Sequence, residues 1–155
     1  MLAAIELSKT HEVHLFEKGK TLGRKFLVAG KGGFNLTNRL VGAELSANYS
    51  PNFLFENALK HFDSSQTRSW LENLGIPTYV GSSGRVFPEK GIKPIQVLNA
   101  LKERLCAQNT QVYYEHKFVD FTPKKICFLH KGVLVESSYD NCIFALGGAS
   151  WSVTG

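Results

Sequence analysis

Apolar residues recur along this chain with two different periods, and the change of period separates expected helices from expected strands. Residues 1–10, MLAAIELSKT, are rich in Ala, Leu and Glu and predict a helix. Residues 11–19, HEVHLFEKG, predict a short strand. Residues 21–42 are basic and interrupted by five glycines, which break any helical or strand period, so a long loop is expected there.

Helical spacing returns after this loop, and the residues that flank it predict where two helices begin and end. Ser50 and Pro51 are suited to the N-cap and the first helical position. Asp63 and Gln66 have the spacing of a capping box for the next helix. Gly75 is expected to end that second helix.

The last third of the chain changes from turn residues to a helix and then to short strands. Residues 81–91, GSSGRVFPEKG, predict turns, and a third helix is expected to run to about Asn109. The strand-like runs that follow are 111–114, 118–121, 126–130, 133–136 and 142–146. Their spacing predicts a small antiparallel meander, and the whole pattern predicts one α/β domain over residues 1–155.

Composition and charge narrow the class of protein. The 155 residues are 43% hydrophobic, which is enough for a core, and carry a net charge of +5, which favours an anionic partner. The three cysteines form no CxxC pair and the five histidines show no paired spacing, so no metal site is expected. We find neither a secretory signal pattern nor an apolar run long enough for a membrane helix, and the expected location is the cytoplasm.

Glu17 ends the first expected strand, where dinucleotide-binding folds place an acidic side chain that accepts hydrogen bonds from ribose hydroxyls. In such folds the acidic residue follows a G-x-G-x-x-G loop by about 20 residues. Counting back that far from Glu17 passes Met1, so the expected pyrophosphate loop is missing from this sequence. The alternative interpretation is a solvated residue at a strand end.

The segment GRKFLVAGKGGFNLTN, residues 23–38, combines cations, closely spaced glycines and side-chain amides. Arg24 and Lys25 are suited to neutralising a pyrophosphate. Glycines let backbone N–H groups come close to a ring or an anion because no Cβ intervenes. A surface loop with solvated charges is the alternative.

Residues 23–38 make the sequence recognisable, together with RSWLENLGIPTYVGSSGRVFPEKG at 68–91 and FALGGASW at 144–151. In this order, and after a strand-end Glu, these stretches resemble the bacterial NAD(P)/FAD-dependent flavoproteins of the aminoacetone-oxidase-like type. Members of that family begin with a strand and a glycine-rich phosphate loop, and they continue beyond the last stretch. The resemblance therefore implies an incomplete FAD-binding domain with a partial Rossmann-like α/β fold.

The resemblance also implies roles for individual residues. Glu17 would hold the adenosine ribose, Arg24 and Lys25 the phosphate or ribityl region, and the backbone at Phe118 the adenine. Arg85 would face the flavin or substrate pocket, with a structural arginine bonded to turn carbonyls as the alternative. The implied cofactor-binding positions are Glu17, Lys18, Arg24, Lys25, Gly30, Gly32, Gly33, Asn35, Asn38, Phe118, Ala145, Gly147 and Gly148.

The function expected from these observations is FAD-dependent electron transfer between a nicotinamide, such as NAD(P)H, or an organic substrate and the flavin. In such proteins the cofactor performs the redox chemistry, and the protein supplies binding and electrostatics. A non-catalytic basic module that binds nucleic acid or another polyanion is one alternative, and an inactive truncated flavoprotein is another. No catalytic residue is identifiable.

Overall fold

A computed structural model describes residues 1–29, 34–108 and 110–147 of the chain. Its residues group into two compact units, one formed by Met1–Val28 with Leu101–Gly155 and the other by Ala29–Ala100. We describe each unit by itself. The predicted positions Gly30, Gly32, Gly33 and Gly148, like the end of the FALGGASW stretch, lie outside the described residues.

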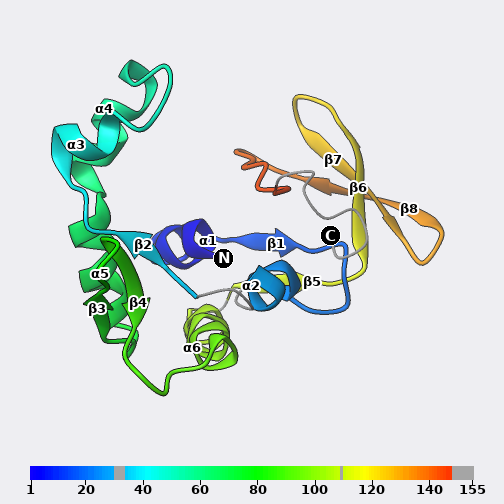
Figure 1. The fold of residues 1–155 in the computed structure, drawn as a ribbon. Helices are drawn as coiled ribbons and strands as arrows, with labels where there is room; N and C mark the ends of the chain where they lie inside the picture. Colours follow the sequence, from blue (N-terminus) through cyan, green and yellow to red (C-terminus); the bar gives the residue numbers. More distant parts are fainter. Residues whose placement is uncertain (30–33, 109, 148–155) are drawn as a thin grey trace. The chain divides into compact units, whose positions relative to one another are not determined.

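The first unit contains a parallel strand pair and a separate antiparallel meander (Figure 1). Strand β1 (His14–Phe16) runs parallel to β5 (Gln111–Tyr113), as expected for an α/β fold. The meander has the strand order β6-β7-β8, with all neighbours antiparallel. The remaining elements of this unit are α1 (Leu2–Leu7), most of α2 (Arg24–Ala29), the second half of α6 (Pro94–Ala107), β6 (His116–Phe121), β7 (Lys125–His130) and β8 (Val133–Ser138).

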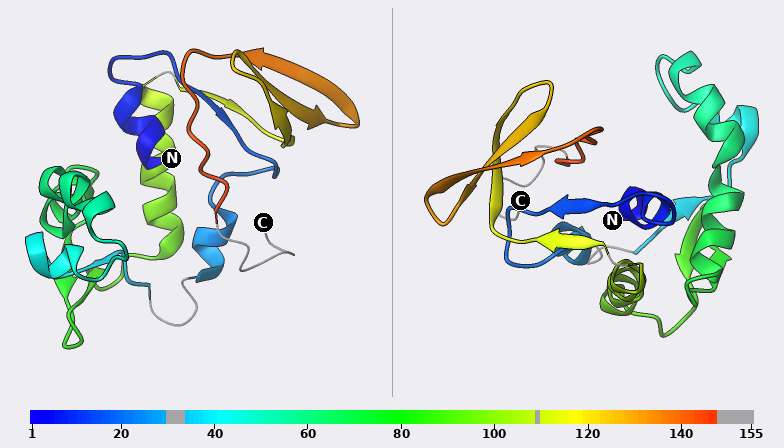
Figure 2. Two further views of the ribbon diagram at one scale, coloured as in Figure 1. Left: turned by 90° about the horizontal axis from the view of Figure 1, so that it is seen from above. Right: turned by 180° about the vertical axis from the view of Figure 1, so that it is seen from behind.

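The second unit combines a small antiparallel sheet with short helices. The sheet has the order β2-β4-β3, so β4 (Arg85–Pro88) lies between β2 (Thr37–Asn38) and β3 (Thr78–Val80). Contacts join α5 to β2 and β3, and α3 to α4 (Figure 2). The helices are α3 (Gly42–Ser46), α4 (Phe53–His61), α5 (Ser64–Glu72) and the first half of α6.

Apolar side chains fill a core in each unit. In the first unit, Phe16 of β1 stacks between the rings of Tyr113 and Phe128, with centroid distances of 4.8 and 4.1 Å. This stack joins the parallel pair to the meander through aromatic burial. The buried apolar residues of this unit are Ala4, Ile5, Leu22, Leu101, Leu105, Ile126 and Phe128, and those of the second unit are Leu45, Leu71, Ile76, Val86, Val97 and Leu98.

Several boundaries follow the predicted signals. The Asp63 carboxylate accepts hydrogen bonds from the N–H groups of Ser65 and Gln66, and the Gln66 side chain accepts one from the Asp63 N–H, so the capping box before α5 is confirmed. Gly75 follows this helix with a φ of 75°, which a glycine adopts without a Cβ penalty. The third predicted helix is α6.

Other predictions were wrong. The loop expected over residues 21–42 contains α2 and β2, and the turns expected over 81–91 contain β4. Both strands form because distant segments pair with them, a contribution that local residue preferences do not contain. The helix expected to begin at Ser50 begins later, with Asn52 as its N-cap.

The run at 142–146 also differs from its prediction, because it forms no strand. A strand needs a ladder partner, and the described part of the chain places none beside it. The run at 111–114 joins the parallel pair rather than the meander. None of the helices in the described residues is long and apolar enough to cross a membrane.

Candidate cofactor site

Glu17 lies immediately after β1, at the carboxyl end of the parallel pair. Its backbone is fixed from two sides, because its N–H donates to the Tyr113 carbonyl at 2.8 Å and its carbonyl accepts from the His116 N–H at 3.0 Å. In open α/β sheets, ligands bind at the carboxyl ends of parallel strands. The predicted ribose-binding residue therefore lies where such folds place their ligands.

The Glu17 side chain is oriented by the loop that follows it. Its Oε1 atom accepts a hydrogen bond from the Gly19 N–H at 2.7 Å. Within the described residues, Oε2 has no partner, and Glu17 is half-buried. One carboxylate oxygen thus holds the loop, and the other is available to accept hydrogen bonds from a ligand.

Gly19 is a site residue that sequence reasoning missed. Besides its N–H, which reaches the Glu17 carboxylate, its carbonyl accepts a hydrogen bond from the Glu115 N–H at 3.1 Å. This second bond ties the loop to the segment just before β6. The spacing Glu-x-Gly directly after a strand was the one signal in the sequence for this role.

Lys25 and Gly147 lie close together, although they are far apart in the sequence. A Cβ built on Gly147 would be 3.9 Å from Lys25 Nζ. Gly147 has a φ of 74°, a left-handed conformation that disfavours other residues. A predicted phosphate-binding cation therefore lies beside the predicted close-approach glycine.

The neighbours of this pair are open to solvent. Arg24 precedes Lys25 in α2 and is exposed, Lys18 is exposed in the loop after β1, and Ala145 is exposed before Gly147. Exposed guanidinium and ammonium groups can reach a phosphate without first breaking a buried ion pair.

Phe118 lies in β6, one of the two edge strands of the meander. Its register partner is Phe128, and the register of β6 against β7 shifts between Phe118 and Asp120. Such a bulge takes a backbone segment out of the regular ladder. Because the first residue of β6, His116, donates to the Glu17 carbonyl, the start of this edge strand lies next to Glu17.

Asn38 and Arg85 face each other in the second unit, where they are register partners on β2 and β4. The Asn38 Oδ1 atom accepts hydrogen bonds from the Leu40 N–H at 2.8 Å and from Ser64 Oγ at 3.2 Å. Its amide NH₂ group therefore remains as the part that can donate to a ligand. Asn35 is exposed.

The Arg85 side chain is exposed and, among the described residues, its guanidinium has no hydrogen-bond or ion-pair partner. Among the described residues, the Arg85 side chain therefore does not make the bonds to turn carbonyls that a structural arginine would make. It is the Arg85 backbone carbonyl that accepts, from the Gly81 N–H at 2.8 Å.

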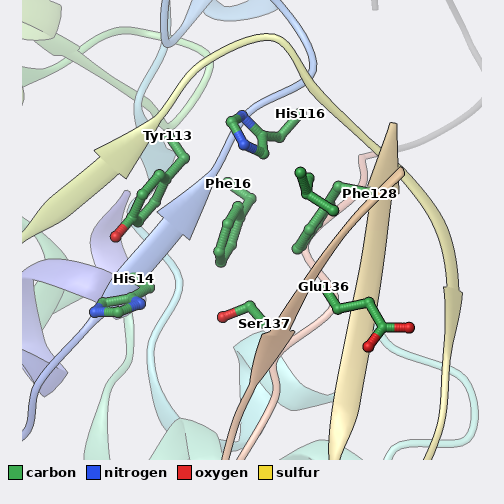
Figure 3. A pocket seen from close by; sticks show the side chains of 8 residues that line it. His14, Phe16, Tyr113, His116, Phe128, Glu136 and Ser137 are labelled. Atoms are coloured by element: carbon green, nitrogen blue, oxygen red, sulfur yellow. The ribbon is translucent and has the colours of Figure 1, made fainter. Parts of the chain in front are cut away.

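A cavity of about 220 Å³ lies in the first unit, between the parallel pair and the meander (Figure 3). Its volume is below the range of about 300–1,000 Å³ that is typical of small-molecule sites. The cavity is therefore too small for a dinucleotide. Its lining residues are His14, Phe16, Tyr113, His116, Phe128, Val135, Glu136 and Ser137.

An ion pair on the meander shifts the pKa of one of its members. Glu136 accepts a hydrogen bond from Lys125 at 2.6 Å, and this bond together with the charge of Glu136 raises the pKa of Lys125 above its ordinary value. Both side chains are about half exposed, so the pair contributes little to stability. Within the described residues, no group of three or more His, Cys, Asp or Glu side chains is placed to hold a metal ion.

Comparison with known proteins identifies the domain. A family model described as the HI0933-like protein Rossmann domain matches residues 1–155. The chain belongs to this family. This membership confirms the predicted Rossmann-like α/β fold class and the resemblance to FAD-dependent oxidoreductases at the level of the family.

Two curated proteins are similar to this member of the HI0933-like family. The 3-dehydro-bile acid delta(4,6)-reductase of Clostridium scindens is 29% identical over 112 residues, which cover 72% of this chain and 27% of that protein. The ribosomal RNA dihydrouridine synthase of Haemophilus influenzae is 24% identical over 155 residues, which cover 97% of this chain and 38% of that protein. The chain thus spans less than half the length of either relative.

Proposed function

We propose that this chain is the FAD-binding part of a flavoprotein oxidoreductase. The observation that carries the proposal is the Glu17 carboxylate, which is fixed at the carboxyl end of β1 with one oxygen bonded to Gly19 and the other available. A carboxylate in this position is suited to accept hydrogen bonds from the hydroxyls of an adenosine ribose. The HI0933-like family assignment supports the same function.

The other residues of the first unit complete a binding surface for the cofactor. Lys25, beside Gly147, and the exposed Arg24 would neutralise the diphosphate, and Lys18 would add a cation near Glu17. The edge of β6 at Phe118 would present backbone groups to the adenine. These donors and acceptors fit the ADP half of FAD.

The bound isoalloxazine would supply the redox chemistry, taking up electrons from a nicotinamide or an organic substrate and passing them on. The contribution of the protein is to bind and orient the cofactor. In the second unit, Asn38 and Arg85 offer an amide donor and a cation, and Asn35 is exposed nearby in sequence. We propose these three residues as contacts for the flavin or the substrate.

The proposal is tested by titrating the chain with FAD and following flavin fluorescence. We expect saturable binding, and weaker binding of riboflavin, which lacks the diphosphate and adenosine that Glu17 and Lys25 would contact. Charge-assisted hydrogen bonds contribute about 1.5–3 kcal/mol, so Glu17→Gln should weaken FAD binding by about tenfold or more. Glu103→Gln makes the same chemical change on the exposed surface of α6 and should have no effect. Absence of saturable binding, or equal effects of the two variants, would contradict the proposal.

A second candidate concerns the substrate. The net charge of +5 favours a polyanion, and one relative is a ribosomal RNA dihydrouridine synthase, so RNA is a candidate substrate class. If cations of this chain contact RNA phosphates, the logarithm of the binding constant should fall linearly with the logarithm of salt concentration. Ribosomal RNA binding that is absent at low salt would exclude this candidate for the chain.

A further inference from the structure

The loop after β1 is held by hydrogen bonds that run in both directions between it and the segment joining β5 to β6. The Glu17 N–H donates to the Tyr113 carbonyl at 2.8 Å. In return, the N–H groups of Glu115 and His116 donate to the carbonyls of Gly19 and Glu17 at 3.1 and 3.0 Å. The backbone on both sides of the Glu17 side chain is therefore fixed by a neighbouring segment that is distant in the sequence.

Within this frame, Gly19 makes a contact that fixes the Glu17 side chain as well. The Gly19 N–H donates to Glu17 Oε1 at 2.7 Å, a short bond of the kind that charged acceptors form. The peptide groups on either side of this N–H are also held, because the Glu17 carbonyl accepts from the His116 N–H and the Gly19 carbonyl accepts from the Glu115 N–H. The carboxylate is thus oriented before any ligand arrives.

The space around Gly19 explains why a glycine suits this position. A Cβ built on Gly19 would lie 3.1 Å from Glu17 Oε1, closer than an ordinary van der Waals contact. A side chain at position 19 would therefore press on the same oxygen that the Gly19 N–H holds. The carboxylate would have to move by a few tenths of an ångström, and Oε2 would move with it.

We propose that Gly19 is a positioning residue for the cofactor, which preorganises the Glu17 carboxylate so that Oε2 meets the ribose hydroxyls. This inference rests on the proposed function, and it adds a residue that need not touch the cofactor. Fixing a binding group in its bound orientation lowers the entropic cost of binding. The affinity for FAD then depends on position 19 through Glu17.

A double-mutant cycle tests this dependence in the fluorescence titration with FAD. Gly19→Ala should weaken FAD binding by about threefold or more in the unmodified chain. In the Glu17→Gln background, where the carboxylate charge is already absent, the same substitution should change the affinity by about twofold at most. A purely structural role of Gly19 would lower the affinity equally in both backgrounds.

Gly81→Ala is the matched control for the added methyl group. A Cβ built on Gly81 would meet the Phe87 ring at 2.9 Å, so this substitution is at least as crowded, but it belongs to the second unit and not to the loop that follows β1. We expect the coupling free energy between Gly81→Ala and Glu17→Gln in FAD binding to be zero. Far-ultraviolet circular dichroism of each variant shows that it is folded.

A measurement without FAD separates failure of this inference from failure of the proposed function. Amide hydrogen exchange should show the Gly19 N–H protected in the free chain and exchanging faster in Glu17→Ala, which lacks the acceptor. A protected amide without saturable FAD binding would refute the proposed function, and the cofactor role of Gly19 with it. The inference alone would be overturned by a different pair of results. FAD would bind saturably and more weakly to Glu17→Gln, but Gly19→Ala would lower the FAD affinity equally in both backgrounds.

Discussion

The packing of the meander against β1 predicts a large cost for removing the Phe128 ring. Phe128 is 2% exposed, its ring stacks on Phe16 at 4.1 Å, and it meets His116 edge-on at 5.9 Å. Truncation of a buried Phe to Ala costs about 3–5 kcal/mol, because apolar contacts are lost and a cavity remains. A domain has only about 5–15 kcal/mol of unfolding free energy, so Phe128→Ala should be strongly destabilised.

The matched control is Leu134→Ala. Leu134 lies on β8, and its neighbour Val135 is the register partner of Phe128, so Leu134 points to the other face of the sheet, where it is 58% exposed. Its truncation should cost about 1 kcal/mol or less.

Urea unfolding followed by circular dichroism measures both free energies. With an m-value of about 2 kcal/mol per molar urea, the midpoint of Phe128→Ala should fall by about 2 M and that of Leu134→Ala by about 0.5 M or less. If Phe128→Ala does not fold, Phe128→Leu provides a smaller loss at the same position. Equal shifts for the two positions would refute the assignment of the buried face.

Three further predictions rest on single contacts. Asp63→Ala should lower the free energy of unfolding by about 0.5–2 kcal/mol, measured by urea unfolding, because the N-terminal N–H groups of α5 lose their acceptor. Gly147→Ala should weaken FAD binding in the fluorescence titration, because it strains a φ of 74° beside Lys25. Gly75→Ala, at a φ of 75° with no atom within 4 Å of its Cβ, should strain the backbone in the same way without affecting FAD. Glu136→Gln should cause a small destabilisation near neutral pH. Because Glu136 raises the pKa of Lys125 above its ordinary value of 10.5, this loss of stability is fully present below pH 10.5 and is removed as the pH rises through the pKa of folded Lys125. Unfolding midpoints of the two chains should therefore differ less at about pH 11 than at about pH 8.

Local signals in the sequence were sufficient for elements whose stability is local. The Asp63–Gln66 capping box gave a correct helix, because a capping side chain acts within a few residues. Strand β4 was missed because its residues lie among Gly, Ser and Pro. It pairs with β2 and β3, and the local pattern of apolar and polar residues does not predict pairing with a strand as distant in the sequence as β2.

The same distinction applies to the candidate site. The strand-end position of Glu17 was predictable, since a strand followed by an acidic residue is visible in the sequence. The closeness of Lys25 to Gly147 was not, because nothing in local spacing relates two distant segments. Only the resemblance to a family placed both residues at one cofactor, and that assignment stays a prediction.

The segment between β5 and β6 connects the stability of the meander to the geometry around Glu17. Glu115 has a φ of 59°, a left-handed conformation that costs a non-glycine residue free energy and persists only where surrounding contacts hold it. Here those contacts are the N–H groups of Glu115 and His116, which both donate to the loop after β1. The left-handed turn at Glu115 therefore directs two consecutive N–H groups toward the segment that carries the Glu17 carboxylate.

This connection implies that the fold of the meander and the binding of FAD are thermodynamically linked. His116 begins β6 and also contacts the Phe128 ring, so loosening the meander at Phe128 loosens a donor of the Glu17 loop. A ligand that binds only the folded state stabilises it by mass action, and its apparent affinity falls in proportion to the fraction of the chain in the binding-competent state. FAD affinity should accordingly follow packing at Phe128, a residue that the proposed site does not include, and should be indifferent to Leu134 on the opposite face.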